Sequence, residues 1–194
     1  MKIRPIQNLL FVLLVLSCQN PFSTRKAETP DLSENRWIPP YSPDLVLDNL
    51  INSVADHDAD HFVRCLSSGT GDQAYFFIPD PQVVNVYPGA FDGWDVNKER
   101  AAIRQIFAWT AADSLCQLSF LENVLETQSA DSAVFIKHYR LDIHHSRPST
   151  PTRFEGRMEL KLVPIGGEWF ITRWRDQAES DVPTWSRLKA MAGG

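Results

Sequence analysis

Apolar residues recur at three- and four-residue spacing just after residue 42. Ser42, Pro43 and Asp44 form a typical helix start, with Ser42 as the N-cap, proline at the first helical position and an acid in the first turn. The apolar stripe that follows consists of Leu47, Leu50, Ile51 and Val54. This spacing predicts an amphipathic helix, because the four side chains fall on one face.

Two more helices and two short strands are expected before residue 114. Asp58 can cap a short helix that carries Phe62 and Cys65, and Asp95 can cap a longer helix over residues 96–109. Between them, the apolar run 74–78 predicts a buried strand, and residues 83–87 predict a second short strand.

The second half of the chain changes to a period of two. Four long segments, 118–127, 133–143, 154–163 and 168–177, are separated by short polar or glycine-containing connections. In the third segment the apolar positions are Phe154, Gly156, Met158, Leu160 and Leu162. Strict alternation indicates one buried face, and short connections favour antiparallel neighbours. Helices followed by a meander predict an α+β domain, which residues 182–189 close with a helical turn.

The amino end has the layout of an export signal. Lys2 and Arg4 precede an unbroken apolar run over residues 9–16, which is too short to span a bilayer as a permanent helix. The segment 15–18, Val-Leu-Ser-Cys, resembles a bacterial lipobox, which implies that residues 1–17 are removed and Cys18 is lipidated. The alternative is an ordinary secretory signal in which Cys18 is incidental. The lipobox implies anchoring in the bacterial cell envelope, and Gln19 after the cysteine favours the outer membrane.

Residues 18–42 are expected to be a tether between the anchor and a domain over residues 43–194. Four prolines in this range, a fifth at Pro43 and the lack of apolar periodicity argue against a helix or a central strand. Trp37, Ile38 and Tyr41 are unusual in a linker, so we expect them to pack on the edge of the domain.

Composition and charge limit the kinds of partner that the protein is expected to have. The 194 residues suit one domain with a tail, and the formal charge of −5 argues against nucleic-acid binding. Loss of Lys2 and Arg4 with the signal would lower this charge by two, to −7. The expected partner is the membrane, reached through the lipid, with the acidic domain held away from anionic headgroups.

The order of these elements resembles that of the NTF2-like or SnoaL-like superfamily. The resemblance covers roughly residues 43–190 and includes a terminal strand that carries Gly167, Trp169, Ile171, Trp174 and Asp176. It implies a cone in which N-terminal helices pack in the concave face of a strongly curved antiparallel sheet, and a homodimer formed through the outer sheet face. Enzymes of the superfamily keep ionisable side chains in the cone, but no complete set maps onto this sequence.

The strongest candidate for chemistry is a run in the second long strand. His138, Arg140 and Asp142 share one face, which is either the cone wall or the outer surface, and the apolar Leu141 and Ile143 favour the outer position. Facing inward, His138 and Asp142 could join Tyr75 in acid-base chemistry.

Other side chains suggest ligand binding. Tyr75 and Trp94 can line an apolar pocket, and Arg140 or Arg173 can hold an anionic group, although core packing and cross-strand ion pairs are the plainer uses. His57 with His61, and His144 with His145, are better explained as polar junction and loop residues than as metal ligands. Cys65 and Cys116 are expected to be buried free thiols, although export would permit a disulfide. No phosphate loop, nucleophile elbow, zinc spacing or dinucleotide fingerprint occurs, so no cofactor or metal is expected.

These observations support three hypotheses. The first is a lipid-anchored envelope domain that binds a small apolar or amphipathic ligand, or a protein partner, without catalysis. The second is a cofactor-independent lyase or isomerase that uses His138, Asp142 and Tyr75. The third is a structural accessory module whose cone is filled.

Overall fold

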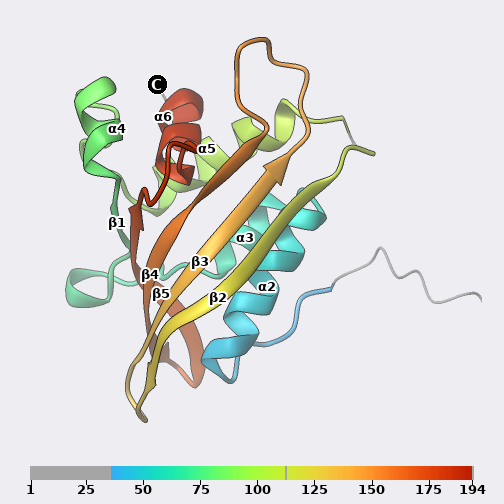
Figure 1. Ribbon diagram of the computed structural model, residues 1–194. Helices are drawn as coiled ribbons and strands as arrows, with labels where there is room; N and C mark the ends of the chain where they lie inside the picture. The colour runs from blue at the N-terminus through green and yellow to red at the C-terminus, as the bar shows by residue number, and fades with distance from the viewer. Residues whose placement is uncertain (1–35, 112, 194) are drawn as a thin grey trace, which may run out of the picture. The chain divides into compact units, whose positions relative to one another are not determined.

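A computed structural model describes residues 36–111 and 113–193 and shows one five-stranded sheet (Figure 1). The strand order is β1-β5-β4-β3-β2, in which β2 to β5 form an antiparallel meander and β1 pairs with β5 in parallel. The strands are β1 (Phe76–Ile78), β2 (Cys116–Gln128), β3 (Ala133–Ile143), β4 (Arg153–Ile165) and β5 (Glu168–Gln177). The meander predicted from the period of two is confirmed.

Helices cover one face of this sheet. They are α2 (Pro43–Ala55), α3 (Ala59–Arg64), α4 (Pro81–Val86), α5 (Val96–Ala108) and α6 (Trp185–Gly193), with a short 3-10 turn η1 (Gly71–Gln73) before β1. In Figure 1, α2 and α3 lie against the concave side of the curved sheet, and α5 and α6 lie side by side near one end of it. The α+β cone with helices in its concave face is therefore confirmed. No described helix is long and apolar enough to cross a membrane.

The starts of α2, α3 and α5 were predicted correctly from local signals. Asp58 accepts from the backbone N–H groups of Asp60 and His61, and Asp95 accepts from those of Asn97 and Lys98. These bonds satisfy donors that the first helical turn leaves free. Ser42 occupies the N-cap position of α2 but makes no side-chain bond there, so Pro43 at the first position provides the start signal.

Alternation along the strands separates the two sheet faces. In β4 the predicted apolar positions from Phe154 to Leu162 are all buried, and the charged residues between them are half-buried. In β3 the same alternation buries Tyr139 and leaves His138 and Arg140 on the outer face. The core therefore lies between the inner face of the sheet and the helices.

Three predicted elements differ from the structure. Residues 83–87 are not a strand, because Asp80 caps a helix that begins at Pro81 and runs to Val86. The strand at 74–78 was expected to be buried, but it is an edge strand in which Phe76 is 58% exposed. The closing turn is a nine-residue helix, α6, that runs to Gly193.

Candidate functional site

The interior of the cone holds a buried ion pair. Lys189 Nζ from α6 lies 2.8 Å from Glu99 Oε1 in α5, and both side chains are 1% exposed. The other Glu99 oxygen accepts from Trp94 Nε1 at 2.7 Å and from the Tyr75 hydroxyl at 3.1 Å. Three separate segments therefore supply partners to one buried carboxylate, which burial alone would strongly disfavour.

Aromatic rings surround the lysine. Its Nζ lies 3.6 Å from the ring centre of Phe77 and 4.1 Å from that of Trp174, within the range of cation-π attraction. Burial lowers the pKa of Lys189, and the neighbouring Glu99 opposes that shift. Burial is also the main cause that raises the pKa of Tyr75 well above its ordinary value, with the Glu99 charge second.

A second buried cluster joins β5 to the start of α6. Asp176 accepts from the Tyr139 hydroxyl at 2.7 Å and from both the backbone N–H and the hydroxyl of Ser186 at 2.6 Å. The Tyr139 hydroxyl in turn accepts from the Trp185 N–H. Burial raises the pKa of Asp176, and its hydrogen bonds oppose that shift.

Helix α6 thus completes both interior clusters with its own side chains. Lys189 and Ser186 are bonded to the carboxylates that would otherwise face the hollow of the cone. Acid-base catalysis needs ionisable groups within hydrogen-bond reach of a substrate. Here the ionisable groups of the two clusters are bonded within those clusters and are almost fully buried.

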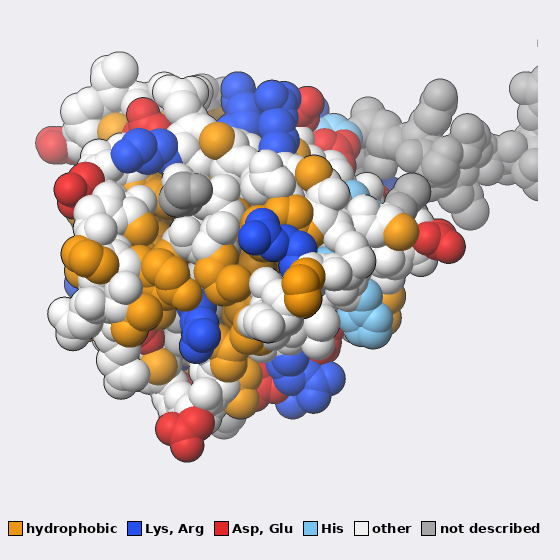
Figure 2. All heavy atoms as spheres, turned by 90° about the horizontal axis from the view of Figure 1, so that it is seen from above, with side chains coloured by type: hydrophobic (Ala, Val, Ile, Leu, Met, Phe, Trp, Pro, Cys, Tyr) orange, Lys and Arg blue, Asp and Glu red, His pale blue; other side chains and the backbone are white. Residues whose placement is uncertain are grey.

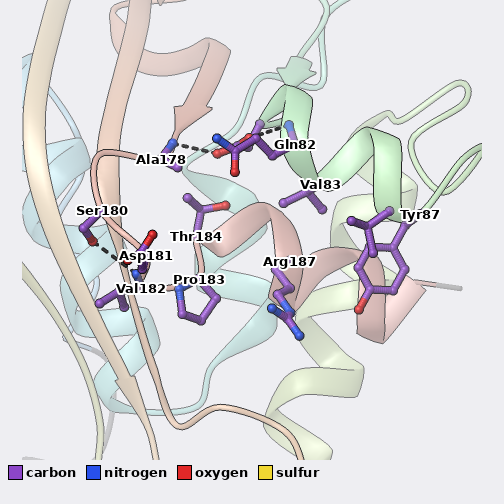
Figure 3. Close-up of a pocket in the computed structure, with 12 residues that line it drawn as sticks. Gln82, Val83, Tyr87, Ala178, Ser180, Asp181, Val182, Pro183, Thr184 and Arg187 are labelled. Atoms are coloured by element: carbon purple, nitrogen blue, oxygen red, sulfur yellow. Dashed lines mark hydrogen bonds between the residues drawn. The ribbon is translucent and has the colours of Figure 1, made fainter.

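An open pocket lies at the side of the cone, between α4 and the segment 178–184 that leads into α6. Its volume is about 240 Å³, and Figure 3 shows the side chains around it. Figure 2 shows hydrophobic side chains gathered on the face of the molecule that carries α4 and α6. The pocket is lined by Asp80, Gln82, Val83, Val86, Tyr87, Ala178, Ser180, Asp181, Val182, Pro183, Thr184 and Arg187.

The pocket wall contains both satisfied and unsatisfied polar groups. The buried Asp80 carboxylate accepts from the N–H groups of Gln82 and Ala178 at 2.7 and 2.6 Å, which ties α4 to the end of β5. The Thr184 hydroxyl is buried but has no hydrogen-bond partner. Arg187 is exposed, and no ion pair joins it to another described residue. The pocket therefore has an apolar part, formed by Val83, Val86, Val182 and Pro183, next to a hydroxyl and a cation for which the described residues supply no partner.

The sequence-predicted residues fall on two sides of the sheet. His138, Arg140 and Asp142 lie on the outer face, where His138 contacts a glutamate in the segment after β5 and the other two form cross-strand ion pairs. These pairs are His138 with Glu179 (2.5 Å), Arg140 with Glu155 (2.6 Å) and Asp142 with Arg153 (2.7 Å). Tyr75 lies in the buried interior, so the sheet separates it from His138 and Asp142.

The residues proposed for ligand binding are not brought together either. Tyr75 and Trp94 meet at Glu99 inside the cone. Arg173 instead extends from β5 on the outer face to Glu159 at 2.6 Å, which is the cross-strand ion pair expected as the alternative to ligand binding.

The histidine pairs serve local structure. His61 bonds to Asp58 at 2.7 Å and stacks on Trp37, while His57 packs against Phe107. His145 bonds to the Pro151 carbonyl. Across residues 36–111 and 113–193, no three histidine, cysteine or acidic side chains are grouped as a metal site. Cys65 and Cys116 are buried free thiols, as expected.

Sequence reasoning missed the residues that matter most to these two regions. Lys189, Glu99 and Arg187 belong to no sequence motif, and residues 83–87, most of which lie in α4, favour a strand when considered alone. One usable signal was the sequence Asp80-Pro81, which combines a good N-cap with proline at the first helical position.

Comparisons with known proteins find similarity in structure alone. No protein-family model matches the chain, and no curated protein sequence matches it. A candidate calcium/calmodulin dependent protein kinase II association domain from Xanthomonas campestris is 10% identical, with a TM-score of 0.52 over 72% of this chain and 86% of that one. The Kfla4162 protein from Kribbella flavida is 13% identical, with a TM-score of 0.50 over 74% and 91%. An NTF-2 like protein of unknown function from Shewanella oneidensis is 16% identical, with a TM-score of 0.46 over 68% and 93%. At these identities the likeness concerns the fold.

Proposed function

We propose that this domain binds a small amphipathic ligand without catalysis, in the pocket between α4 and the segment 178–184. The observation that carries the proposal is the partnerless Thr184 hydroxyl in a pocket with apolar walls. A buried polar group without a partner is costly, whereas apolar walls favour a ligand that covers them. The internally bonded groups of the cone argue for binding over acid-base chemistry.

The pocket can be tested by closing its mouth. Val86 lines the pocket and is 69% exposed, so Val86→Trp should cover the opening without disturbing the core. We expect the affinity for 1-octanol, measured by NMR titration, to fall at least about tenfold, because the indole occupies the apolar surface that the ligand would bury.

The matched control is Val84→Trp. Val84 lies on the same helix and is 38% exposed, but it does not line the pocket. It should bind 1-octanol as the unmodified chain does. Equal affinities for both variants, or no binding to the unmodified chain, would refute the pocket as a ligand site.

We also propose that Cys18 is lipidated and holds the domain in the bacterial cell envelope, at the outer membrane. Cys18 and the signal segment 1–17 lie outside the described residues, so the proposal rests on the lipobox-like sequence. Several acyl chains on one residue give a far firmer anchor than a single chain. Cys18→Ala should move the protein from the membrane to the soluble fraction, and a variant that stays in the membrane would refute lipidation.

A homodimer through the outer sheet face is a further proposal, supported by the family resemblance. Native mass spectrometry of detergent-extracted protein would measure the oligomer size and the acylation together. A monomer alone would refute the dimer and leave the ligand pocket unaffected.

A further inference from the structure

Two polar side chains that have no partner among the described residues lie in the candidate pocket, one just before α6 and one in its first turn. Thr184 and Arg187 are three residues apart, and the Arg187 N–H donates to the Thr184 carbonyl at 3.0 Å, so the two side chains leave neighbouring positions of one helical turn. Figure 3 shows the Thr184 hydroxyl directed toward the space between Val83 and Arg187.

The neighbouring packing fixes the direction of that hydroxyl. A Cβ built at Gly156 would lie 3.3 Å from the Thr184 methyl group, so the methyl faces β4. The hydroxyl is turned away from the sheet, and Thr184 itself is only 2% exposed. A donor held in this way is preorganised for an acceptor atom that enters from the pocket.

Charge selects the kind of acceptor. Arg187 has no acidic partner among the described residues, and a guanidinium matches the two oxygens of a carboxylate. The acids in the wall are Asp80 and Asp181. Asp80 is occupied by two N–H donors, and in Figure 3 Asp181 lies on the far side of Pro183 from the guanidinium.

The volume and the lining of the pocket limit the size and the polarity of the rest of the ligand. A cavity of about 240 Å³ holds on the order of ten non-hydrogen atoms, at roughly 25–30 Å³ for each. Beyond the polar end the walls are formed by Val83, Val86, Val182 and Pro183, with the ring of Tyr87 beside Arg187 (Figure 3). These walls suit a short hydrocarbon chain.

We propose that the ligand is a small amphipathic carboxylate of medium chain length, whose carboxylate lies between Arg187 and the Thr184 hydroxyl and whose chain covers the valine wall. This inference rests on the proposed pocket and adds the chemical class of its occupant. Octanoate, which has ten non-hydrogen atoms, is a suitable probe.

The experiment compares three probes of equal chain length on the full chain: octanoate, 1-octanol and octylamine. We expect octanoate to bind about tenfold more tightly than 1-octanol, and octylamine to bind more weakly than either, because only the carboxylate forms charge-assisted bonds. Arg187→Gln should abolish the preference for octanoate. Arg100→Gln, at an exposed arginine of α5 outside the pocket, should retain it.

Thr184→Val provides a second variant. It keeps the shape and removes a hydroxyl that bonds to no described residue, so the free energy of unfolding should not fall while the preference for octanoate decreases several-fold.

The outcomes are distinguishable. If octanoate and 1-octanol bind equally to the unmodified chain, or if the preference survives Arg187→Gln, the carboxylate inference is wrong although the pocket binds ligands. If no probe binds, both the inference and the proposed function fail.

Discussion

Lys189 is a charged residue placed where lysine is rarely found. Its ammonium group is buried with one carboxylate partner and two aromatic faces. Such a pair adds little net stability because both charges lose their hydration, yet removal of one partner leaves the other charge buried and alone. The pair therefore fixes how α6 docks on α5.

Lys189→Met tests this role. The variant keeps the hydrocarbon stem and leaves the Glu99 carboxylate without a cation, so we expect the free energy of unfolding to fall by about 3 kcal/mol in urea denaturation. The double variant with Glu99→Gln should recover a large part of that loss, because it removes the remaining charge and keeps an acceptor for Trp94. Additive losses would show that the two charges are not coupled.

Cys65 makes stability depend on pH in the alkaline range. Burial raises the pKa of this thiol far above its ordinary value, and the nearby Arg64 opposes the shift. The folded state therefore keeps its proton while the unfolded chain releases it above about pH 9, so this group's contribution to stability is complete below that pH. Its contribution then falls by about 1.4 kcal/mol per pH unit as pH rises.

Cys65→Ala isolates that effect. The variant should be less stable than the unmodified chain at pH 7, because it leaves a small cavity, and the gap should narrow between pH 9 and pH 10. Urea unfolding of both chains at pH 7, 9 and 10 measures the gap, and changes shared by both chains cancel. A gap that is constant with pH would contradict the assigned cause.

At the scale of elements, the features predicted correctly are those that depend on residues close together in the sequence. The caps at Asp58 and Asp95 and the alternation of β4 depend on a few neighbouring residues, and all three were predicted correctly. The prediction of a strand at residues 83–87 was wrong, because it rested on the preference of valine for strands. In the chain, the Asp80 cap, the proline at 81 and the bond from Ala178 to Asp80 stabilise helix α4.

The candidate site could be predicted only in part, because the spacing of residues along the sequence does not show which distant segments meet in the fold. Alternation showed that His138, Arg140 and Asp142 share a face of β3, and the apolar Leu141 and Ile143 favoured the outer one. The pocket could not be predicted from such local patterns, because it forms where α4 meets a segment about one hundred residues later in the chain. The Asp80–Ala178 hydrogen bond is one contact between these two segments. Lys189 and Glu99 are likewise joined only by tertiary folding.

At the scale of the whole molecule, the folded unit includes the residues just before α2. Ile38 and the Asn49 side chain exchange two hydrogen bonds, of 3.0 and 2.6 Å, and the Pro40 carbonyl accepts from the Trp169 N–H at 2.8 Å. Trp37 packs between His61 and Arg64, so the prediction that it packs on the edge of the domain is confirmed. Tyr41, expected to pack there too, is 69% exposed.

These contacts predict where the chain can be shortened. A chain beginning at Arg36 should unfold in urea with the same free energy as one beginning at Gln19, because residues 36–41 keep all the contacts just described. A chain beginning at Ser42 should lose roughly 3 kcal/mol, since net hydrogen bonds contribute about 1 kcal/mol each and Asn49 is left buried without its partner. Asn49→Ala in the longer chain is the control and should reproduce about half of that loss. Equal stability of the chains beginning at Arg36 and Ser42 would mean that residues 36–41 belong to the tether in energy as well as in composition.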